Sequence, residues 1–160
     1  MSIEIRPARR GEAGLVLTLV RELAVYEELT HEVEATEAVL DAALFGEAPK
    51  IFGDLAFSAG TPAGVAISFL NFSTFKGRSG LYLEDIFVRP DYRGQGIGRA
   101  LLRHLAQRCV REGWGRFEWA VLDWNQTAID FYEARGATVM PDWRICRVTG
   151  AALETLAKGE

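Results

Sequence analysis

The sequence predicts a single α/β domain in which a mixed sheet carries helices on its faces. The chain has 160 residues, a length that suits one domain with one hydrophobic core. Short apolar segments with the period of a strand alternate with longer segments that have the period of a helix. Their order, β-α-α-β-β-β-α-β-α-β, is typical of a mixed sheet covered by helices.

The N-terminal part is predicted to contain one strand and two helices. The strand lies over 3–6 and the first helix over 12–28, where leucines and valines recur three and four residues apart and form one apolar stripe. A second helix is expected over 36–44, because Thr36 can act as its N-cap and Gly46 can end it.

Three strands follow in the middle of the chain. The first two, over 51–59 and 63–72, are separated by Gly60-Thr61-Pro62, which indicates a hairpin turn. The third strand lies over 81–88 and ends just before Pro90.

The C-terminal part returns to alternating helices and strands. A helix begins at Ile97 and ends near Gly113, and a later helix over 126–135 is capped by Asn125 and ended by Gly136. The remaining predicted elements are strands over 117–122 and 144–148 and a terminal helix over 151–157.

Charge is distributed unevenly along the chain, although the net charge is only −4. Eight acidic residues and no lysine or arginine occur over 22–49, whereas seven arginines and two acidic residues occur over 89–116. The first segment favours a cationic ligand and the second an anionic one. Nucleic acid is not an expected partner, because the chain is acidic overall and its basic stretch adjoins a glycine-rich turn.

Other composition signals exclude several classes of protein. No apolar run reaches the roughly 20 residues that a membrane-spanning helix needs, so no membrane partner is expected. The N-terminus lacks the apolar stretch of a secretory signal, which predicts a cytoplasmic location. Two cysteines, Cys109 and Cys146, and two isolated histidines lack the spacing of metal ligands, and no metal site is predicted.

The most informative segment joins the strand over 81–88 to the helix that begins at Ile97. It reads Arg93-Gly94-Gln95-Gly96-Ile97-Gly98-Arg99 and places three alternating glycines at a helix N-terminus. Backbone N–H groups and the positive end of the helix dipole converge there, and glycine lets the backbone approach a ligand closely. We therefore expect a cradle for a ligand that carries phosphates.

Two common phosphate loops do not match this segment. A Walker loop ends in Gly-Lys-Ser/Thr, but Gly98 is followed by Arg99 and Ala100. A dinucleotide fingerprint, G-x-G-x-x-G, fails because Arg99 stands at the place of its third glycine. The segment does match a third pattern, Arg/Gln-x-x-Gly-x-Gly/Ala, through Arg93, Gly96 and Gly98.

With a second segment, this third pattern resembles the GCN5-related N-acetyltransferase (GNAT) family. The second segment, from Asn125 through Phe131-Tyr132 to Gly136-Ala137, is similar to the family's N-x-x-A-I-x-F-Y-x-x-x-G-[AF] pattern. The stretches Arg6-Pro7-Ala8, 22–27, 81–88 and 91–94 look like the subgroup of diamine acetyltransferases, which includes spermidine/spermine and thialysine enzymes. The resemblance implies the GNAT fold, a mixed and mostly antiparallel sheet with a splayed central strand pair and helices on both faces.

The resemblance also implies acetyl-coenzyme A as the co-substrate. The glycine turn would hold the pyrophosphate, and the end of the preceding strand would offer backbone groups to pantetheine as an added strand does. Asn125 would contact pantetheine, cap its helix, or do both. The expected cofactor-binding residues are Ile86, Phe87, Val88, Arg93, Gly94, Gln95, Gly96, Ile97, Gly98, Arg99, Asn125, Thr127 and Ala128.

Tyr132 and Glu84 are the expected catalytic residues. In the family, the tyrosine equivalent to Tyr132 lies beside the coenzyme sulfur and donates a proton to the leaving thiolate. Glu84 would accept a proton, directly or through water, from an alkylammonium whose pKa is about 10. The alternatives are a tyrosine that packs in the core and a structural carboxylate paired with arginine.

Strand alternation separates Glu84 from its neighbour Asp85. It puts Glu84 on one face with Tyr82 and Asp85 on the other with Leu83. A bulge, which the family has on this strand, would re-aim one of the two acids.

The amine would be bound by residues that match the diamine subgroup. Tyr26 and Glu27 would hold a distal ammonium, or they form only an exposed helix end. Trp143 would wall the pocket or pack against the sheet. The expected substrate-binding residues are Tyr26, Glu27, Glu84, Asp85 and Trp143.

The predicted activity is transfer of the acetyl group of acetyl-coenzyme A to a primary amine of a small cationic substrate. Diamines, polyamines and thialysine-like amino acids are the expected acceptors. Two other functions stay open, which are acetylation of a protein N-terminus or lysine and non-catalytic sensing of acyl-coenzyme A. The resemblance further implies a homodimer formed through the late strand and the terminal segment.

Overall fold

The computed structural model describes residues 2–159, which form two compact units. The first unit ends at Ala120 and contains the sheet with the helices α1 to α3. The second unit begins at Val121 and contains the helices α4 and α5.

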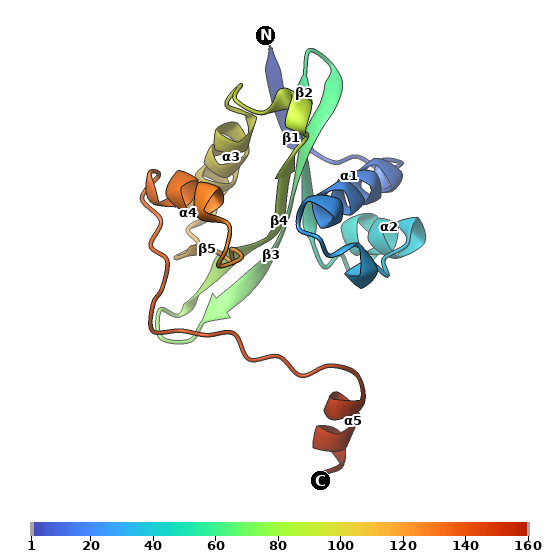
Figure 1. Ribbon diagram of the computed structural model, residues 1–160, viewed down its shortest axis with the longest axis vertical. Coiled ribbons are helices and arrows are strands. Elements are labelled where there is room, and N and C mark those ends of the chain that lie inside the picture. Colours follow the sequence, from blue (N-terminus) through green and yellow to red (C-terminus); the bar gives the residue numbers. More distant parts are fainter. Residues whose placement is uncertain (1, 160) are drawn as a thin grey trace. The chain divides into compact units, whose positions relative to one another are not determined.

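A five-stranded sheet forms the centre of the first unit (Figure 1). Its strand order follows the chain, with antiparallel neighbours from β1 to β4 and with β5 parallel to β4. This is the mixed, mostly antiparallel sheet that the sequence predicts. The strands are β1 (Ile3–Pro7), β2 (Phe52–Ser58), β3 (Thr61–Ser73), β4 (Arg78–Val88) and β5 (Phe117–Trp119).

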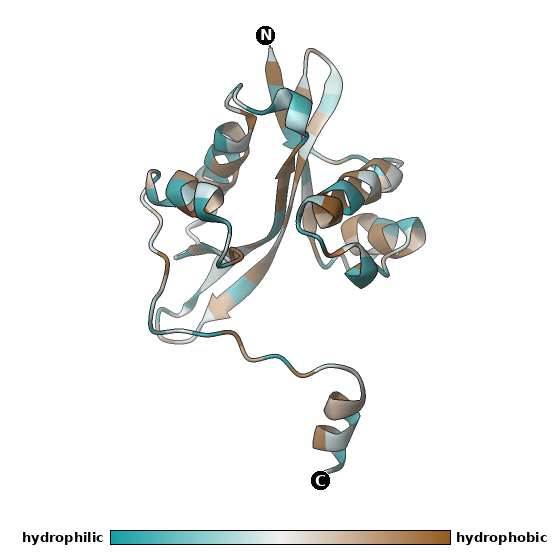
Figure 2. Cartoon of the chain, in the orientation of Figure 1, coloured by the Kyte–Doolittle hydropathy of each residue, from teal (hydrophilic) through white to brown (hydrophobic). Residues whose placement is uncertain are grey.

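Two helices, α1 (Ala13–Tyr26) and α2 (Glu37–Phe45), cover one face of the sheet (Figure 1). Figure 2 shows hydrophobic and hydrophilic residues alternating along α1, and the hydrophobic ones form the buried stripe. Thr36 caps α2 as predicted, because its hydroxyl accepts a hydrogen bond of 3.2 Å from the Val39 N–H. A short 3₁₀ turn, Thr30–Glu32, lies between the two helices in the chain.

The third helix, α3 (Ile97–Glu112), covers the opposite face and is tied to the sheet by a buried charge cluster. Asp54 on β2 is completely buried and accepts two hydrogen bonds from the Arg108 guanidinium, of 2.6 and 3.0 Å. The His104 Nε2 lies 2.9 Å from the same carboxylate. A buried carboxylate is tolerated only with such partners, so the cluster fixes how α3 lies on β2. The helix ends at Gly113, as predicted.

A β-bulge at Glu84 interrupts the alternation of β4. On β3, Ile67 pairs with Asp85 and Ser68 pairs with Leu83, which leaves Glu84 as the extra residue. Neighbouring residues of a strand point to opposite faces, so Asp85 shares the α1 face with the core residue Ile67, and Leu83 shares the α3 face with Ser68. The bulge implied by the family resemblance is confirmed, and the simple alternation that grouped Asp85 with Leu83 is wrong.

The pairing of β4 with β5 is short. It covers only Leu81–Leu83 against Phe117–Trp119, and β4 then continues to Val88. Within residues 2–159, no strand pairs with this last part of β4 on its β5 side. The splayed strand pair is therefore confirmed. The strand predicted over 117–122 ends early, because a strand persists only where its backbone has a partner.

The hairpin between β2 and β3 turns earlier than the sequence suggests. Ala59 and Gly60 form the turn, with φ of +47° and +81°, and Thr61 and Pro62 already belong to β3. Two consecutive positive φ angles match the twist of the flanking strands in a two-residue hairpin turn. The expected turn at Gly60-Thr61-Pro62 is thus wrong in its position, because its first residue is Ala59.

The second unit contains α4 (Gln126–Glu133) and α5 (Gly150–Lys158). The strand predicted over 144–148 is wrong, since no strand forms there and Ile145 and Val148 are 70% and 45% exposed. Apolar alternation makes a strand only where another strand supplies backbone partners, and the described residues of this unit contain no strand.

Candidate active site

The glycine turn between β4 and α3 is open to a ligand. Gly94 and Gly96 have φ of +77° and +85°, and Gly96 precedes α3 without a side chain that caps the helix. A Cβ added to either glycine would meet no atom within 4 Å beyond its chain neighbours. The first N–H groups of a helix have no acceptor inside it, so this open turn fits a diphosphate.

The other residues of the turn differ in what they can offer. Ile97 is only 1% exposed and packs in the core, which leaves its backbone rather than its side chain for a ligand. The side-chain amide oxygen of Gln95, Oε1, accepts a hydrogen bond of 3.4 Å from the Ser58 hydroxyl. Arg99 is exposed at the first turn of α3, and Gly98 lies beside it. The turn is thus a backbone cradle with one accessible cation at the helix start.

The side chain of Arg93 lies against the end of α1. Its Nε donates a hydrogen bond of 3.0 Å to the Val88 carbonyl. The guanidinium carbon lies 4.8 Å from the centre of the Tyr26 ring and 5.8 Å from that of the Phe87 ring. The Arg93 guanidinium, from a predicted cofactor residue, therefore lies near the ring of a predicted substrate residue, Tyr26.

The two neighbouring acids of β4 have different surroundings. Asp85 is partly buried, and this burial raises its pKa to about 6, with smaller contributions from the charges of Glu84 and Glu27. Glu84, the bulge residue, is exposed. The structure therefore gives Asp85 a perturbed carboxylate of the kind that is typical of functional sites.

The end of α1 supplies the third acid of this group. Glu27 follows directly after α1, and burial raises its pKa. One turn earlier, Glu22 forms a two-pronged ion pair with Arg89, with both N–O distances 2.9 Å. Arg89 also donates to the Pro62 carbonyl at 2.9 Å. These bonds hold the end of α1 against the residues that follow β4.

This clamp was missed by reasoning from the sequence. Glu22 and Arg89 lie in the acid-rich and arginine-rich stretches, but no spacing rule connects residues that are 67 positions apart. Opposite charge was the only signal, and it matches many pairs in this chain equally well.

The remaining predicted residues lie in the second unit. Asn125 caps α4 as predicted, with its Oδ1 accepting a hydrogen bond of 3.2 Å from the Ala128 N–H, and Thr127 lies in the same first turn. The rings of Phe131 and Tyr132 meet edge to face at 5.6 Å. Since consecutive helical residues point about 100° apart, one ring can pack while the other faces a ligand.

Two further features concern packing around Phe131 and Trp143. The Arg135 guanidinium lies 3.6 Å from the centre of the Phe131 ring, so Phe131 has a stacking partner of its own. Trp143 is 77% exposed.

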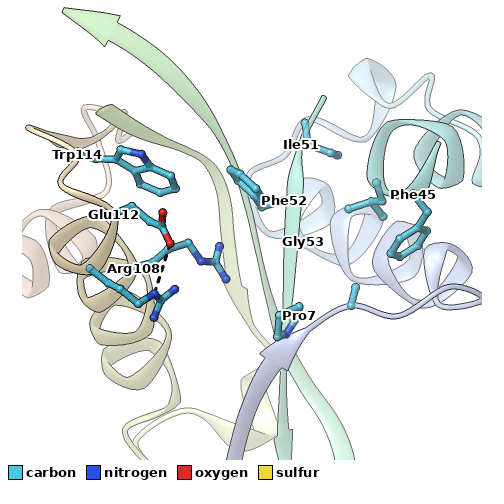
Figure 3. Close-up of a pocket in the computed structure, with 11 residues that line it drawn as sticks. Pro7, Phe45, Ile51, Phe52, Gly53, Arg108, Glu112 and Trp114 are labelled. Atoms are coloured by element: carbon cyan, nitrogen blue, oxygen red, sulfur yellow. Dashed lines mark ion pairs between the residues drawn. The ribbon is translucent and has the colours of Figure 1, made fainter. Parts of the chain in front are cut away.

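A cavity of about 530 Å³ lies elsewhere in the first unit (Figure 3). It is lined at the start of β2 by Phe52 and on α3 by Arg108 and Arg111. β2 and β4 run in the same direction, so this cavity is at the opposite end of the sheet from the glycine turn. Arg108 is paired with Asp54 and Arg111 with Glu112, at 3.5 Å. Both cations are thus already neutralised, and the cavity does not suit an anionic cofactor.

Comparisons with known proteins agree with this geometry. A family model described as "Acetyltransferase (GNAT) family" matches residues 16–137. The thialysine N-epsilon-acetyltransferase of Bos taurus is 39% identical over 97% of both chains, and the L-ornithine N5-acetyltransferase of Arabidopsis thaliana is 34% identical over 99% of this chain and 89% of its own. An integron cassette protein from the mobile metagenome of V. cholerae, 29% identical, has a similar structure, with a TM-score of 0.81 and 99% of each chain covered.

The fold, the open glycine turn and these matches define an acetyl-coenzyme A-dependent N-acetyltransferase. The chain belongs to the GNAT family of acetyltransferases. Among residues 2–159, no helix is both long and apolar enough to cross a membrane.

Proposed function

We propose that this enzyme acetylates a primary amine of a small cationic substrate, such as a diamine, a polyamine or a thialysine-like amino acid. The observation that carries the proposal is a group of three acids in which the charges of Glu84 and Glu27 both act on the partly buried Asp85. Such a group favours an ammonium over a neutral ligand. The names of the two similar enzymes, which specify thialysine and L-ornithine, support the same class of acceptor.

The co-substrate would be bound mainly by backbone groups. The turn over 93–99 would hold the diphosphate, and Ile86, Phe87 and Val88 would present the unpaired edge of β4 to the pantetheine arm. Asn125, Thr127 and Ala128 would complete this binding from the start of α4. Acetyl-coenzyme A supplies the activated acetyl thioester.

Asp85 is the residue that we propose to accept the proton from the substrate ammonium. With a pKa of about 6, the Asp85 carboxylate is a stronger base than an ordinary carboxylate, and it is still ionised at pH 7. Glu84, the base expected from the sequence, is exposed at the bulge and would pass the proton to water. Tyr26 and Glu27 would bind the far end of the substrate, with Trp143 as a further contact.

Tyr132 would act as the general acid through its phenol Oη. The leaving thiolate needs a proton, and a phenol held at hydrogen-bond distance supplies one. The role requires that the Tyr132 hydroxyl reach the sulfur when the co-substrate is bound.

A thiol-release screen tests the proposal. The purified chain is incubated with acetyl-coenzyme A and, separately, putrescine, spermidine, thialysine, L-ornithine, an aminoglycoside and a lysine-containing peptide. We expect release of free thiol with the small diamines or diamino acids. Release with the peptide alone would favour a protein acetyltransferase. Binding of the co-substrate without thiol release from any amine would favour a sensor.

We further propose that the enzyme is a cytoplasmic homodimer. Several large apolar side chains of the second unit are exposed, including Trp143 and Ile145 at 77% and 70%, and a second copy would cover them. The two cysteines are free thiols, which suits a reducing compartment. Sedimentation velocity across a range of protein concentrations tests the dimer, and a monomer at all concentrations would contradict it.

A further inference from the structure

The end of α1 depends on a cation from outside the helix. Residues 22–29 contain no lysine or arginine, and three acids, Glu22, Glu27 and Glu28, lie toward the negative end of the helix dipole. Glu28 also has a φ of +61°, a left-handed conformation that costs free energy in residues other than glycine. Both features weaken this end of the helix, and the ion pair of Glu22 with Arg89 offsets one of the three charges.

The backbone of Arg89 is anchored independently of this ion pair. Its N–H donates a hydrogen bond of 2.8 Å to the Ala63 carbonyl of β3, next to the paired residues Gly64 and Val88. Its own carbonyl accepts a hydrogen bond of 2.9 Å from the Tyr92 N–H, within the 3₁₀ turn Pro90–Tyr92. Loss of the Arg89 side chain would therefore release the end of α1 and leave the connection from β4 to the glycine turn in place.

The residues that we propose to bind the acceptor lie on the part of α1 that Arg89 holds. Tyr26 is four residues after Glu22, and residues four apart are neighbours on one side of a helix. The next residue, Glu27, acts through its charge on Asp85 of β4. The two-pronged geometry of the Glu22–Arg89 pair is specific in distance and direction, so it fixes where these acceptor-binding residues lie relative to β4.

We propose that Arg89 is a positioning residue that acts through Glu22 and holds Tyr26 and Glu27 where they bind the acceptor amine near Asp85. The inference rests on the proposed function and adds to it a residue that contacts neither substrate. Without the ion pair, the last turn of α1 would move relative to β4, whereas the glycine turn would keep its shape. The amine would then bind more weakly, and acetyl-coenzyme A would bind as before.

Amine kinetics at saturating acetyl-coenzyme A test this role. In Arg89→Gln and in Glu22→Gln, kcat/KM for the amine should fall about 10- to 100-fold, mainly through KM, because small displacements of a binding group are costly at a reacting centre. The Kd for acetyl-coenzyme A should hold. Arg89→Lys should recover part of the loss, since lysine keeps the charge but not the planar fork. The double variant Glu22→Gln/Arg89→Gln should lose no more than either single variant, because both substitutions remove the same contact.

The chain contains a matched control pair at the other end of α1. Arg6 donates two hydrogen bonds to the carboxylate of Glu12, of 2.7 and 2.9 Å, and a third to the Pro7 carbonyl at 3.1 Å. Arg89 likewise makes two bonds to a glutamate and one to a proline carbonyl. Arg6→Gln thus removes the same kind of contact from the start of α1. It should lower the temperature of thermal unfolding, as Arg89→Gln does, and leave the KM for the amine unchanged.

A measurement without turnover separates this inference from the proposed function. The charges that act on Asp85 are those of Glu84 on its own strand and of Glu27 at the end of α1. If the end of α1 is released, the effect of Glu27 weakens, so the pKa of Asp85 should fall in Arg89→Gln and hold in Arg6→Gln. NMR titration of the side-chain carboxyl carbons measures this pKa even if no amine is acetylated.

The outcomes that contradict the two proposals differ. Absence of thiol release with every amine contradicts the proposed function, and the pKa of Asp85 then still tests what Arg89 holds in place. Three results would overturn the assignment of Arg89: an equal rise in the KM for the amine in Arg6→Gln, additive losses in the double variant, or an unchanged pKa of Asp85 in Arg89→Gln.

Discussion

Asp54 on β2 and Arg108 on α3 form a two-pronged ion pair in which the aspartate has no exposed surface. Removing only one charge of a buried pair lowers the stability of the fold strongly, because the remaining partner is left buried and unpaired. The pair therefore fixes the position of the helix whose first turn forms the glycine cradle.

Asp54→Ala should lower the free energy of unfolding by about 3–5 kcal/mol, since Arg108 and His104 lose their shared acceptor. Urea denaturation followed by circular dichroism measures the change. The double variant Asp54→Ala/Arg108→Met should recover part of the loss, because no buried charge is left alone. A loss of less than 1 kcal/mol in the single variant would contradict this account of the pair.

Glycine at position 96 should matter for co-substrate binding as well as for stability. Gly96 and Gly113 both have positive φ and cap the two ends of α3, and neither has an atom near the place of a Cβ. Alanine at either should therefore cost about 1–2 kcal/mol of stability through backbone strain alone. Only Gly96→Ala should also raise the Kd for acetyl-coenzyme A, by at least tenfold, in isothermal titration calorimetry. Equal affinities of the two variants would remove the glycine turn from the binding site.

Removal of the Tyr132 hydroxyl should slow the chemical step without weakening co-substrate binding. Tyr132→Phe is expected to lower kcat at least tenfold, because no proton is delivered to the leaving group, while the Kd for acetyl-coenzyme A holds. Tyr92→Phe removes a phenol hydroxyl elsewhere and serves as the control. Unchanged turnover in the first variant would exclude Tyr132 from the mechanism.

The raised pKa of Asp85 predicts a feature of the pH–rate profile. As the pH rises through about 6, Asp85 loses its proton and becomes able to accept one, so kcat/KM for the amine should increase in that range. Asp85→Asn should abolish this limb, whereas Glu84→Gln should retain it. If Glu84→Gln alone removed the limb, Glu84 rather than Asp85 would be the base.

The same pKa predicts how stability depends on pH. The folded protein holds the Asp85 proton up to about pH 6, whereas in the unfolded chain the group titrates near 3.8. Between these values the folded state binds more protons, so this group's contribution to stability falls as the pH rises. Asp85→Asn should therefore stabilise the protein at pH 7 relative to wild type and have little effect of this kind below pH 4, as thermal unfolding at both pH values would reveal.

Local features of the fold could be predicted well from the sequence. The stripe of leucines in α1, the caps Thr36 and Asn125, and the glycine that ends α3 each depend on residues within one or two turns of one another. The conformation of Gly96 belongs to the same class, since a turn before a helix that needs a positive φ selects glycine locally.

Features that depend on distant parts of the chain were not accessible in this way. The pairs Glu22–Arg89 and Asp54–Arg108 join residues 67 and 54 positions apart, and any of several acids and arginines would have fitted equally well. The strand expected over 144–148 was predicted but does not form. Apolar and polar residues alternate there, but the described residues of this unit contain no strand that could pair with it. Likewise, the different surroundings of Glu84 and Asp85 follow from a register that only the pairing with β3 reveals.

The bulge at Glu84 changes the shape of β4 and does not decide which faces of the sheet Leu83 and Asp85 occupy. If Glu84 were excised, Leu83 and Asp85 would become consecutive residues of a regular ladder and would keep the opposite faces that they occupy now. What would disappear is the local bend and added twist that an inserted residue gives a strand. The curvature of β4 just before its unpaired end therefore comes from one extra residue, because β4 has one residue more than β3 at this place. An enzyme without that residue would have the same core and a straighter β4.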